Sequence, residues 1–219
     1  MCPDGATDAN CTRYLIDCND YQGHDGTGRG LVYIKPVDWT GEPFLVVCLG
    51  GNTLIQMRDN VSSCYSFSFN RSWSEYREGF GDIQNGCFWL GNDKIAGITK
   101  STLYYLILAT EIDENITIVA EYYFMMKSAS NNYQLRAVLK HISHLHSDGL
   151  DGPGTNMDVN NKYFYTYDND KNGCAAAGGG GWWYDTGCAY GNLNGNWPRW
   201  PIQGTLKTLD VSWLLLQRH

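Results

Sequence analysis

The chain has 219 residues, and its 16 lysines and arginines stand against 23 aspartates and glutamates, which gives a formal net charge of −7. This balance excludes the basic surface that nucleic-acid binding requires, and no run of about 18 apolar residues is present that would span a membrane. With 43% hydrophobic and 14% aromatic residues, the chain can bury a core, which favours one large folded domain or at most two.

The predicted elements are mainly short strands separated by polar, glycine-rich turns. Turns at residues 38–41 and 50–51 separate three predicted strands at 30–35, 43–49 and 53–58. Alternating apolar and polar residues predict further strands at 102–110, 116–127, 132–139 and 205–216. The spacing of Trp73, Tyr76 and Phe80 predicts a short helix over residues 71–79. The last predicted strand is expected to return to the main sheet.

Residues 141–200 have a different character, with little periodicity. They contain a glycine run, Gly178–Gly181, together with tryptophans and many aspartates and asparagines. A stretch of this length without strong elements is typical of a functional loop region. The sequence therefore predicts one scaffold and one subdomain built from loops.

The cysteines indicate an extracellular protein. Eight cysteines are present and none forms a C-x-x-C pair, so four disulfides in an oxidising compartment are expected. N-glycosylation sequons agree with secretion, and they occur at Asn10, Asn60, Asn70 and Asn115.

No catalytic motif is recognisable, and an enzyme is not expected. The chain lacks a G-x-S-x-G elbow, an H-E-x-x-H zinc motif and a phosphate-binding loop. The one concentration of histidine, at His141, His144 and His146, would hold zinc if a carboxylate such as Asp148 joined it. A solvated loop is the simpler interpretation, and a secreted zinc hydrolase is kept only as a contrasting hypothesis.

An acidic segment offers calcium ligands. Asp168 and Asp170 are spaced i and i+2, and Asn172 adds an amide oxygen before a glycine. Calcium takes about six to eight oxygen ligands, and tight acidic loops supply them. An acidic turn held by a neighbouring disulfide is the alternative.

Several motifs together resemble the C-terminal domain of fibrinogen. They are FLVVC at 44–48, GGNTLIQMR at 50–58, WSEYREGFG at 73–81, FWLGNDKI at 88–95, and the acidic loop followed by Trp182-Trp183-Tyr184 and Asn192–Gly195. The resemblance implies an α+β fold with a central, mostly antiparallel twisted sheet, few short helices and a loop-rich ligand subdomain. It sets the domain at residues 17–213, with the ligand and calcium subdomain at 141–204, an N-terminal cysteine-containing segment at 1–16 and a tail at 214–219.

The resemblance also implies disulfides. The family pairing assigns Cys18 to Cys48 and Cys174 to Cys188. Cys64 and Cys87 lie outside the family pattern and are expected to pair with each other. Cys2 and Cys11 either close a small N-terminal loop or bridge to another chain, which is the one visible route to a homo-oligomer.

The inherited ligand pocket departs from the family pattern. Fibrinogen's γ chain has glutamine and aspartate where Ala177 and Gly178 stand, and the acetyl-binding lectins have tyrosine and histidine where Gly178 and Ala189 stand. The acidic loop is also shorter than usual, which implies weaker calcium binding. The family's cis bond before the second cysteine would correspond to Gly187–Cys188.

We therefore expect a secreted, non-enzymatic recognition domain of innate-immune lectin type, which binds glycans or acetylated surface groups with calcium as a cofactor. Trp182 and Trp183 are expected to pack the subdomain, whereas Trp197, Trp200 and Tyr190 are expected to be exposed for sugar binding. The candidate ligand residues are Tyr184, Gly187, Cys188, Tyr190, Trp197 and Trp200. The alternative is an adhesion or receptor-ligand module that binds a protein and has no sugar pocket.

Overall fold

The centre of the computed structural model is a nine-stranded sheet. The structure describes residues 6–7, 13–21, 28–60, 64, 66–112, 115–142, 148–150, 158–202 and 205–219. Seven strands lie in the order β1-β2-β3-β13-β6-β7-β8, all antiparallel, and two short strands attach beside β3. The strands of this sheet are β1 (Arg29–Ile34), β2 (Phe44–Leu49), β3 (Asn52–Arg58), β4 (Phe80–Gly81), β5 (Phe88–Trp89), β6 (Tyr104–Ile112), β7 (Asn115–Met126), β8 (Leu135–Ile142) and β13 (Ser212–Arg218). This arrangement confirms the predicted fold class.

Strand β3 lies in the middle of the sheet and is buried on both faces. Its residues from Thr53 to Met57 are all buried, which removes the alternation that an edge strand would show. The buried side-chain Nε2 of Gln56 donates to the hydroxyl of Ser212 on β13 at 3.1 Å, so these two buried polar side chains satisfy each other.

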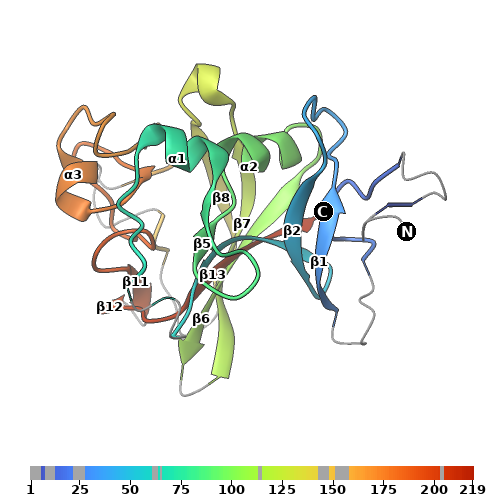
Figure 1. Cartoon of the computed structure of the whole chain (residues 1–219). Coiled ribbons are helices and arrows are strands. Elements are labelled where there is room, and N and C mark those ends of the chain that lie inside the picture. The colour runs from blue at the N-terminus through green and yellow to red at the C-terminus, as the bar shows by residue number, and fades with distance from the viewer. Residues whose placement is uncertain are drawn as a thin grey trace.

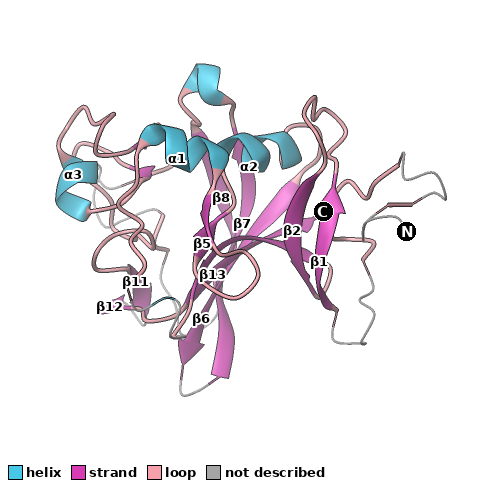
Figure 2. Ribbon diagram, in the orientation of Figure 1, coloured by secondary structure: helices cyan, strands magenta, loops and turns pink. Residues whose placement is uncertain are grey.

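Two helices pack side by side along one end of the sheet, as Figure 2 shows. Helix α1 (Trp73–Glu78) confirms the helix predicted from the aromatic spacing, with Tyr76 as its buried residue. It begins with a capping box in which Ser72 and Glu75 exchange hydrogen bonds, and these bonds lower the pKa of Glu75.

Helix α2 (Asn92–Ile98) was not predicted from the sequence. It begins after Gly91, whose φ of 116° is a conformation that glycine adopts readily and other residues rarely adopt. A Cβ at this position would also lie 2.6 Å from the carbonyl oxygen of Glu78. Asn92 is fully buried and accepts a hydrogen bond from Trp89 Nε1 at 2.8 Å. The helix therefore depends on close contact with α1 and β5, which no local pattern reveals.

The predicted strand at 205–216 is two strands. β12 (Thr205–Thr208) pairs with β11 (Arg199–Ile202) in a separate small sheet, and only β13 returns to the main sheet, between β3 and β6. The chain turns between them, where the Leu209 amide donates to the Pro198 carbonyl at 2.8 Å. β13 continues past residue 213, the predicted end of the domain.

The loop-rich region gathers at the side of the sheet opposite β1, as Figure 1 shows for α3 (Cys174–Gly178), β11 and β12. A two-stranded sheet of β9 (Phe164–Tyr165) and β10 (Trp182–Trp183) links it to the core. Trp182 and Trp183 are each only 1% exposed, so they pack the subdomain as predicted. A short 3₁₀ helix, Ala129–Asn131, follows β7.

Three predicted disulfides are present. Cys18–Cys48, Cys64–Cys87 and Cys174–Cys188 close loops of 30, 23 and 14 residues. Loop closure of this size is worth roughly 3 kcal/mol for each bridge. Cys2 and Cys11 lie outside the described residues, so their pairing stays a prediction. No helix in the described part of the chain is long and apolar enough to cross a bilayer.

Candidate ligand-binding pocket

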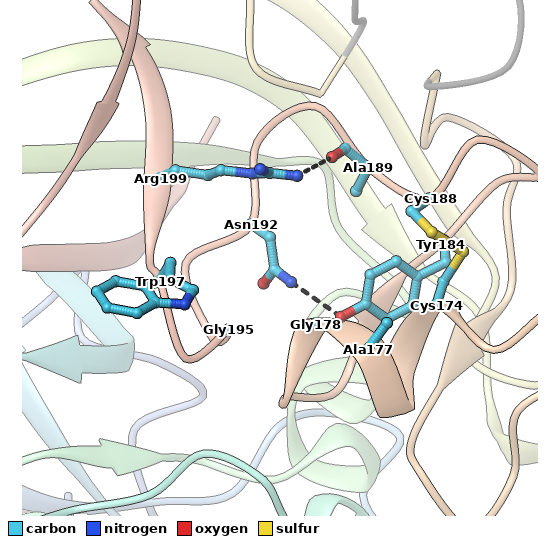
Figure 3. A pocket seen from close by; sticks show the side chains of 10 residues that line it. All are labelled: Cys174, Ala177, Gly178, Tyr184, Cys188, Ala189, Asn192, Gly195, Trp197 and Arg199. Atoms are coloured by element: carbon cyan, nitrogen blue, oxygen red, sulfur yellow. Dashed lines mark hydrogen bonds between the residues drawn. A yellow bond between two sulfur atoms is a disulfide. The ribbon is translucent and has the colours of Figure 1, made fainter.

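A small cavity opens in the loop-rich subdomain, beside α3 and the Cys174–Cys188 disulfide (Figure 3). Its volume is about 200 Å³, which suits a single side chain or a small substituent and not a whole peptide or oligosaccharide. Its lining residues are Cys174, Ala177, Gly178, Tyr184, Cys188, Ala189, Asn192, Gly195, Trp197 and Arg199.

The disulfide side of the pocket is a tight turn. Asp185 and Cys188 exchange backbone hydrogen bonds of 2.8 and 3.0 Å, and Cys188 has a φ of 72°. No peptide bond among the described residues is cis, so the expected cis bond at Gly187–Cys188 is not found. The turn instead uses the left-handed conformation of Cys188, which brings the disulfide back onto α3.

The glycine run allows the chain to pass close to the opposite wall. A Cβ at Gly180 would lie 2.0 Å from the carbonyl oxygen of Asn194, so only glycine fits there. The side-chain Nδ2 of Asn194 donates to the Gly181 carbonyl at 3.1 Å across the same contact. The run is therefore a packing requirement between two segments of the pocket wall.

Buried hydrogen bonds fix the polar groups in one wall of the pocket. The Tyr184 hydroxyl donates to the Gly180 carbonyl at 2.7 Å and accepts from Asn192 Nδ2 at 2.9 Å. The Asn192 side-chain oxygen accepts from the Asn194 amide at 2.9 Å. Burial raises the pKa of Tyr184, so the hydroxyl stays neutral at physiological pH. These groups form a rigid wall.

Arg58 on β3 ties this wall to the main sheet. Its Nε donates to the Leu193 carbonyl at 3.3 Å, and its Nη2 donates to the Gly195 carbonyl at 3.2 Å. Its guanidinium lies 4.5 Å above the ring of Phe69. Desolvation lowers the pKa of Arg58 to about 10, which still leaves it charged at neutral pH. The pocket wall is thus held by a side chain from the scaffold.

The mouth of the pocket carries an exposed tryptophan. Trp197 is 77% exposed, the largest value among the large hydrophobic side chains of the described residues. Next to it, Arg199 lies along the pocket and donates from Nη2 to the Ala189 carbonyl at 3.3 Å. An exposed aromatic ring beside a guanidinium is the combination that recurs at binding hot spots.

The structure gathers three of the six predicted ligand residues in the lining, namely Tyr184, Cys188 and Trp197. Gly187 and Tyr190 are not in the lining. Trp200, expected to be exposed, is 1% exposed, and a Cβ at Gly149 would meet its ring at 2.5 Å. Its indole fills the space between two backbone segments, so it supports the pocket from behind.

Two polar lining residues were absent from the predicted set, Asn192 and Arg199. Asn192 belongs to the Asn192–Gly195 motif, which is part of the resemblance to fibrinogen. Arg199 follows Trp197 by two residues, and only its place on β11 brings it to the cavity. Its amide and carbonyl both pair with Asn192, at 2.8 and 3.0 Å.

The predicted calcium ligands are hydrogen-bond acceptors in this structure. Asp168 accepts from the Trp73 amide at 2.9 Å at the start of α1, and from the Thr166 hydroxyl. Both oxygens of Asp170 accept from backbone amides, those of residues 172, 173 and 176 around the start of α3. The side-chain oxygen of Asn172 accepts from the Cys174 amide. In this conformation the loop fits calcium poorly, and calcium binding stays a prediction.

The remaining predicted positions lie away from the pocket. Asn60, Asn70 and Asn115 are exposed, whereas Asn10 lies outside the described residues. His144 and His146 also lie outside them, while the backbone of His141 belongs to β8. Among the described residues, no group of three or more histidines, cysteines and acidic residues is arranged to hold a metal.

The comparison with family models decides the assignment. Residues 14–216 match the model for the C-terminal globular domain of the fibrinogen beta and gamma chains. The chain belongs to this family. It is 33% identical to the fibrinogen gamma chain of Petromyzon marinus over 214 residues, which cover 89% of this chain and 48% of that protein. It is 29% identical to human angiopoietin-related protein 7, over 83% of this chain and 51% of that protein.

Solved structures of the family agree with the fold. The fibrinogen-like globe domain of human ANGPTL2 superposes with a TM-score of 0.74 at 30% identity, over 93% of this chain and 98% of that one. The lamprey fibrin D-dimer, complexed with the peptide Gly-His-Arg-Pro-amide, gives a TM-score of 0.76 at 27% identity, over 99% and 77%. The chain spans about half of the longer relatives cited above, so it corresponds to their globular domain.

Proposed function

We propose that this fibrinogen-like domain is an extracellular, non-enzymatic recognition module that binds a peptide or protein segment in the pocket beside Trp197. The exposure of Trp197 at the mouth of a rigid cavity is the main support, because a large aromatic ring left 77% exposed contributes nothing to the core. The wall behind it is prearranged by Tyr184 and Asn192, which lowers the entropic cost of binding.

The similar proteins favour a protein ligand. The relatives are fibrinogen chains and angiopoietin-related proteins, and the lamprey fibrin structure holds a short peptide. A cavity of about 200 Å³ would accept one side chain of a peptide, while the exposed indole would cover the neighbouring residue. A bound segment would therefore contact the pocket at one or two positions and the surrounding surface elsewhere.

A glycan or an acetylated surface group is the second candidate. Aromatic faces such as Trp197 stack on sugar rings, and the side-chain amide of Asn192 lines the same cavity. The lining has small residues at Ala177, Gly178 and Ala189, so a sugar would depend mainly on stacking and on Arg199. Single-site sugar affinity is low, and an oligomer joined through Cys2 or Cys11 would raise it by avidity.

One binding experiment separates the two candidates. The disulfide-bonded domain is tested against a peptide library and against an array of plain and acetylated glycans, each in calcium and in EDTA. We expect peptide binding that Trp197→Ala abolishes and that the control Tyr33→Ala retains, since Tyr33 is 38% exposed on β1 at the far side of the sheet. Glycan binding with the same dependence on Trp197 would favour the second candidate, and binding that survives Trp197→Ala would contradict the proposed pocket.

A further inference from the structure

The described residues that line the pocket carry one charge, and it is positive. Among the ten lining residues, Arg199 alone is charged at neutral pH, since both cysteines are bridged and the pKa of the Tyr184 hydroxyl is raised. None of the described residues that line the cavity carries a carboxylate. The chain as a whole carries −7, so this local charge is opposite to that of the protein.

Three described acidic side chains of the surrounding subdomain have partners within the domain. Asp168 and Asp170 accept hydrogen bonds from backbone amides near the starts of α1 and α3. Asp185, on the turn to the disulfide, forms an ion pair with Lys162 at 3.0 Å. These three carboxylates have partners inside the domain, and none of them belongs to the described lining, where the guanidinium is the one charge.

Arg199 has hydrogen-bonding capacity left for a ligand. A guanidinium has five N–H donors in a planar fork, and the structure uses Nη2 for the Ala189 carbonyl. The backbone of Arg199 is fixed by its two hydrogen bonds to Asn192, so the side chain starts from a defined position. Figure 3 shows it extended along one side of the cavity, with Trp197 and Asn192 beside it.

We propose that this pocket selects a peptide segment with a carboxylate, bound by Arg199 while Trp197 covers the adjacent residue. The proposal rests on the proposed function of the pocket and adds the charge of its ligand. A carboxylate matches the guanidinium fork, whereas an arginine or lysine side chain would meet a like charge. At physiological salt the screening length is about 8 Å, so the nearest charge outweighs the net charge of the chain. The peptide in the lamprey fibrin structure contains arginine, so the preference proposed here is the opposite one.

The test uses a random peptide library displayed on phage and selected on the intact domain. The wild-type domain should enrich aspartate and glutamate over the starting library, and Arg199→Gln should lose this enrichment. Arg199→Lys keeps the positive charge and should retain part of it. The control Arg136→Gln changes an exposed arginine on β8 and should select like the wild type.

A matched pair of soluble probes gives the magnitude. Gly-His-Glu-Pro-amide should bind about five- to tenfold more tightly than Gly-His-Arg-Pro-amide, as expected for one exposed charge pair replaced by a repulsive one. Selection of basic or neutral peptides, or acidic enrichment unchanged in Arg199→Gln, would overturn the charge preference and leave the pocket's binding function intact. If no selected peptide depended on Trp197, both the preference and the proposed function would be wrong.

Discussion

Replacing Arg58 with methionine should loosen one wall of the pocket while the main sheet stays folded. The side chain reaches from β3 to the Leu193 and Gly195 carbonyls, at 3.3 and 3.2 Å, and lies over Phe69. Methionine keeps the length and the apolar stem of arginine but cannot donate. The variant therefore leaves two carbonyl groups without their donor at the point where the scaffold meets the pocket.

The expected loss of stability follows from opposing terms. Two hydrogen bonds from a charged donor contribute about 1.5–3 kcal/mol each, and the contact with Phe69 adds about 1 kcal/mol. Methionine also removes the desolvation that lowers the pKa of Arg58 from 12.5 to about 10, which offsets about 3 kcal/mol. The long hydrogen bonds favour the lower half of the range, so the net destabilisation should be about 2 kcal/mol. For a domain of this size, that lowers the Tm by roughly 4–8 °C.

Hydrogen exchange shows where the effect lies. In Arg58→Met, the amides of residues 192–196 should exchange faster, while those of β6 and β7 keep their protection. Arg136→Met, an exposed arginine on β8, should change the Tm by no more than about 1 °C. Equal Tm values for the two variants, with unchanged exchange at residues 192–196, would refute the idea that Arg58 holds the pocket wall.

Three further predictions concern pH, calcium and glycosylation. Burial raises the pKa values of Tyr76, Tyr104 and Tyr184 above that of an unfolded tyrosine, so their contribution to stability is complete below about pH 10 and is lost as the pH rises through the folded values. Absorbance at 295 nm and circular dichroism should show these tyrosines ionising together with unfolding. Ionisation of all 15 tyrosines near pH 10 in a domain that stays folded would contradict this prediction. Calcium should bind weakly, with a Kd of about 10⁻⁴–10⁻³ M, because it must displace the backbone amides that donate to Asp170. Titration calorimetry would contradict this prediction if the wild type gave no heat of binding, or the same heat as Asp170→Asn. When the protein is secreted from eukaryotic cells, Asn115 on β7 should carry a glycan. Glycosidase treatment should then reduce the mass of the protein, and Asn115→Gln should abolish the part of the reduction that comes from this site. An unmodified peptide containing Asn115 in a proteolytic digest would show that the sequon is unused.

The sheet was predictable because turn residues bound its first strands and apolar and polar residues alternate along its later ones, and α1 was predictable because its aromatic spacing is a local signal. The acidic loop was harder, since two carboxylates at i and i+2 suit calcium as well as backbone amides. Its partner amides lie at the start of α1, 95 residues earlier in the chain for Trp73, and around α3. Trp200 shows the same limit, because the backbone that buries it includes Gly149, 51 positions away. Sequence spacing reports what is close along the chain, and these sites are decided by what is close in space.

The pocket combines a hydrogen-bonded interior with an exposed mouth, and this division bears on its specificity. Tyr184, Asn192 and Asn194 are bound to one another and to the glycine run, so a substitution among them would disturb the wall itself. Trp197 and Arg199 project from that wall, and substituting them would change the ligand while leaving the fold in place. Domains with the same scaffold can therefore differ in ligand through a few residues at the pocket mouth. In this chain those residues are an aromatic ring and a cation, which is why a carboxylate-bearing segment is the ligand to test first.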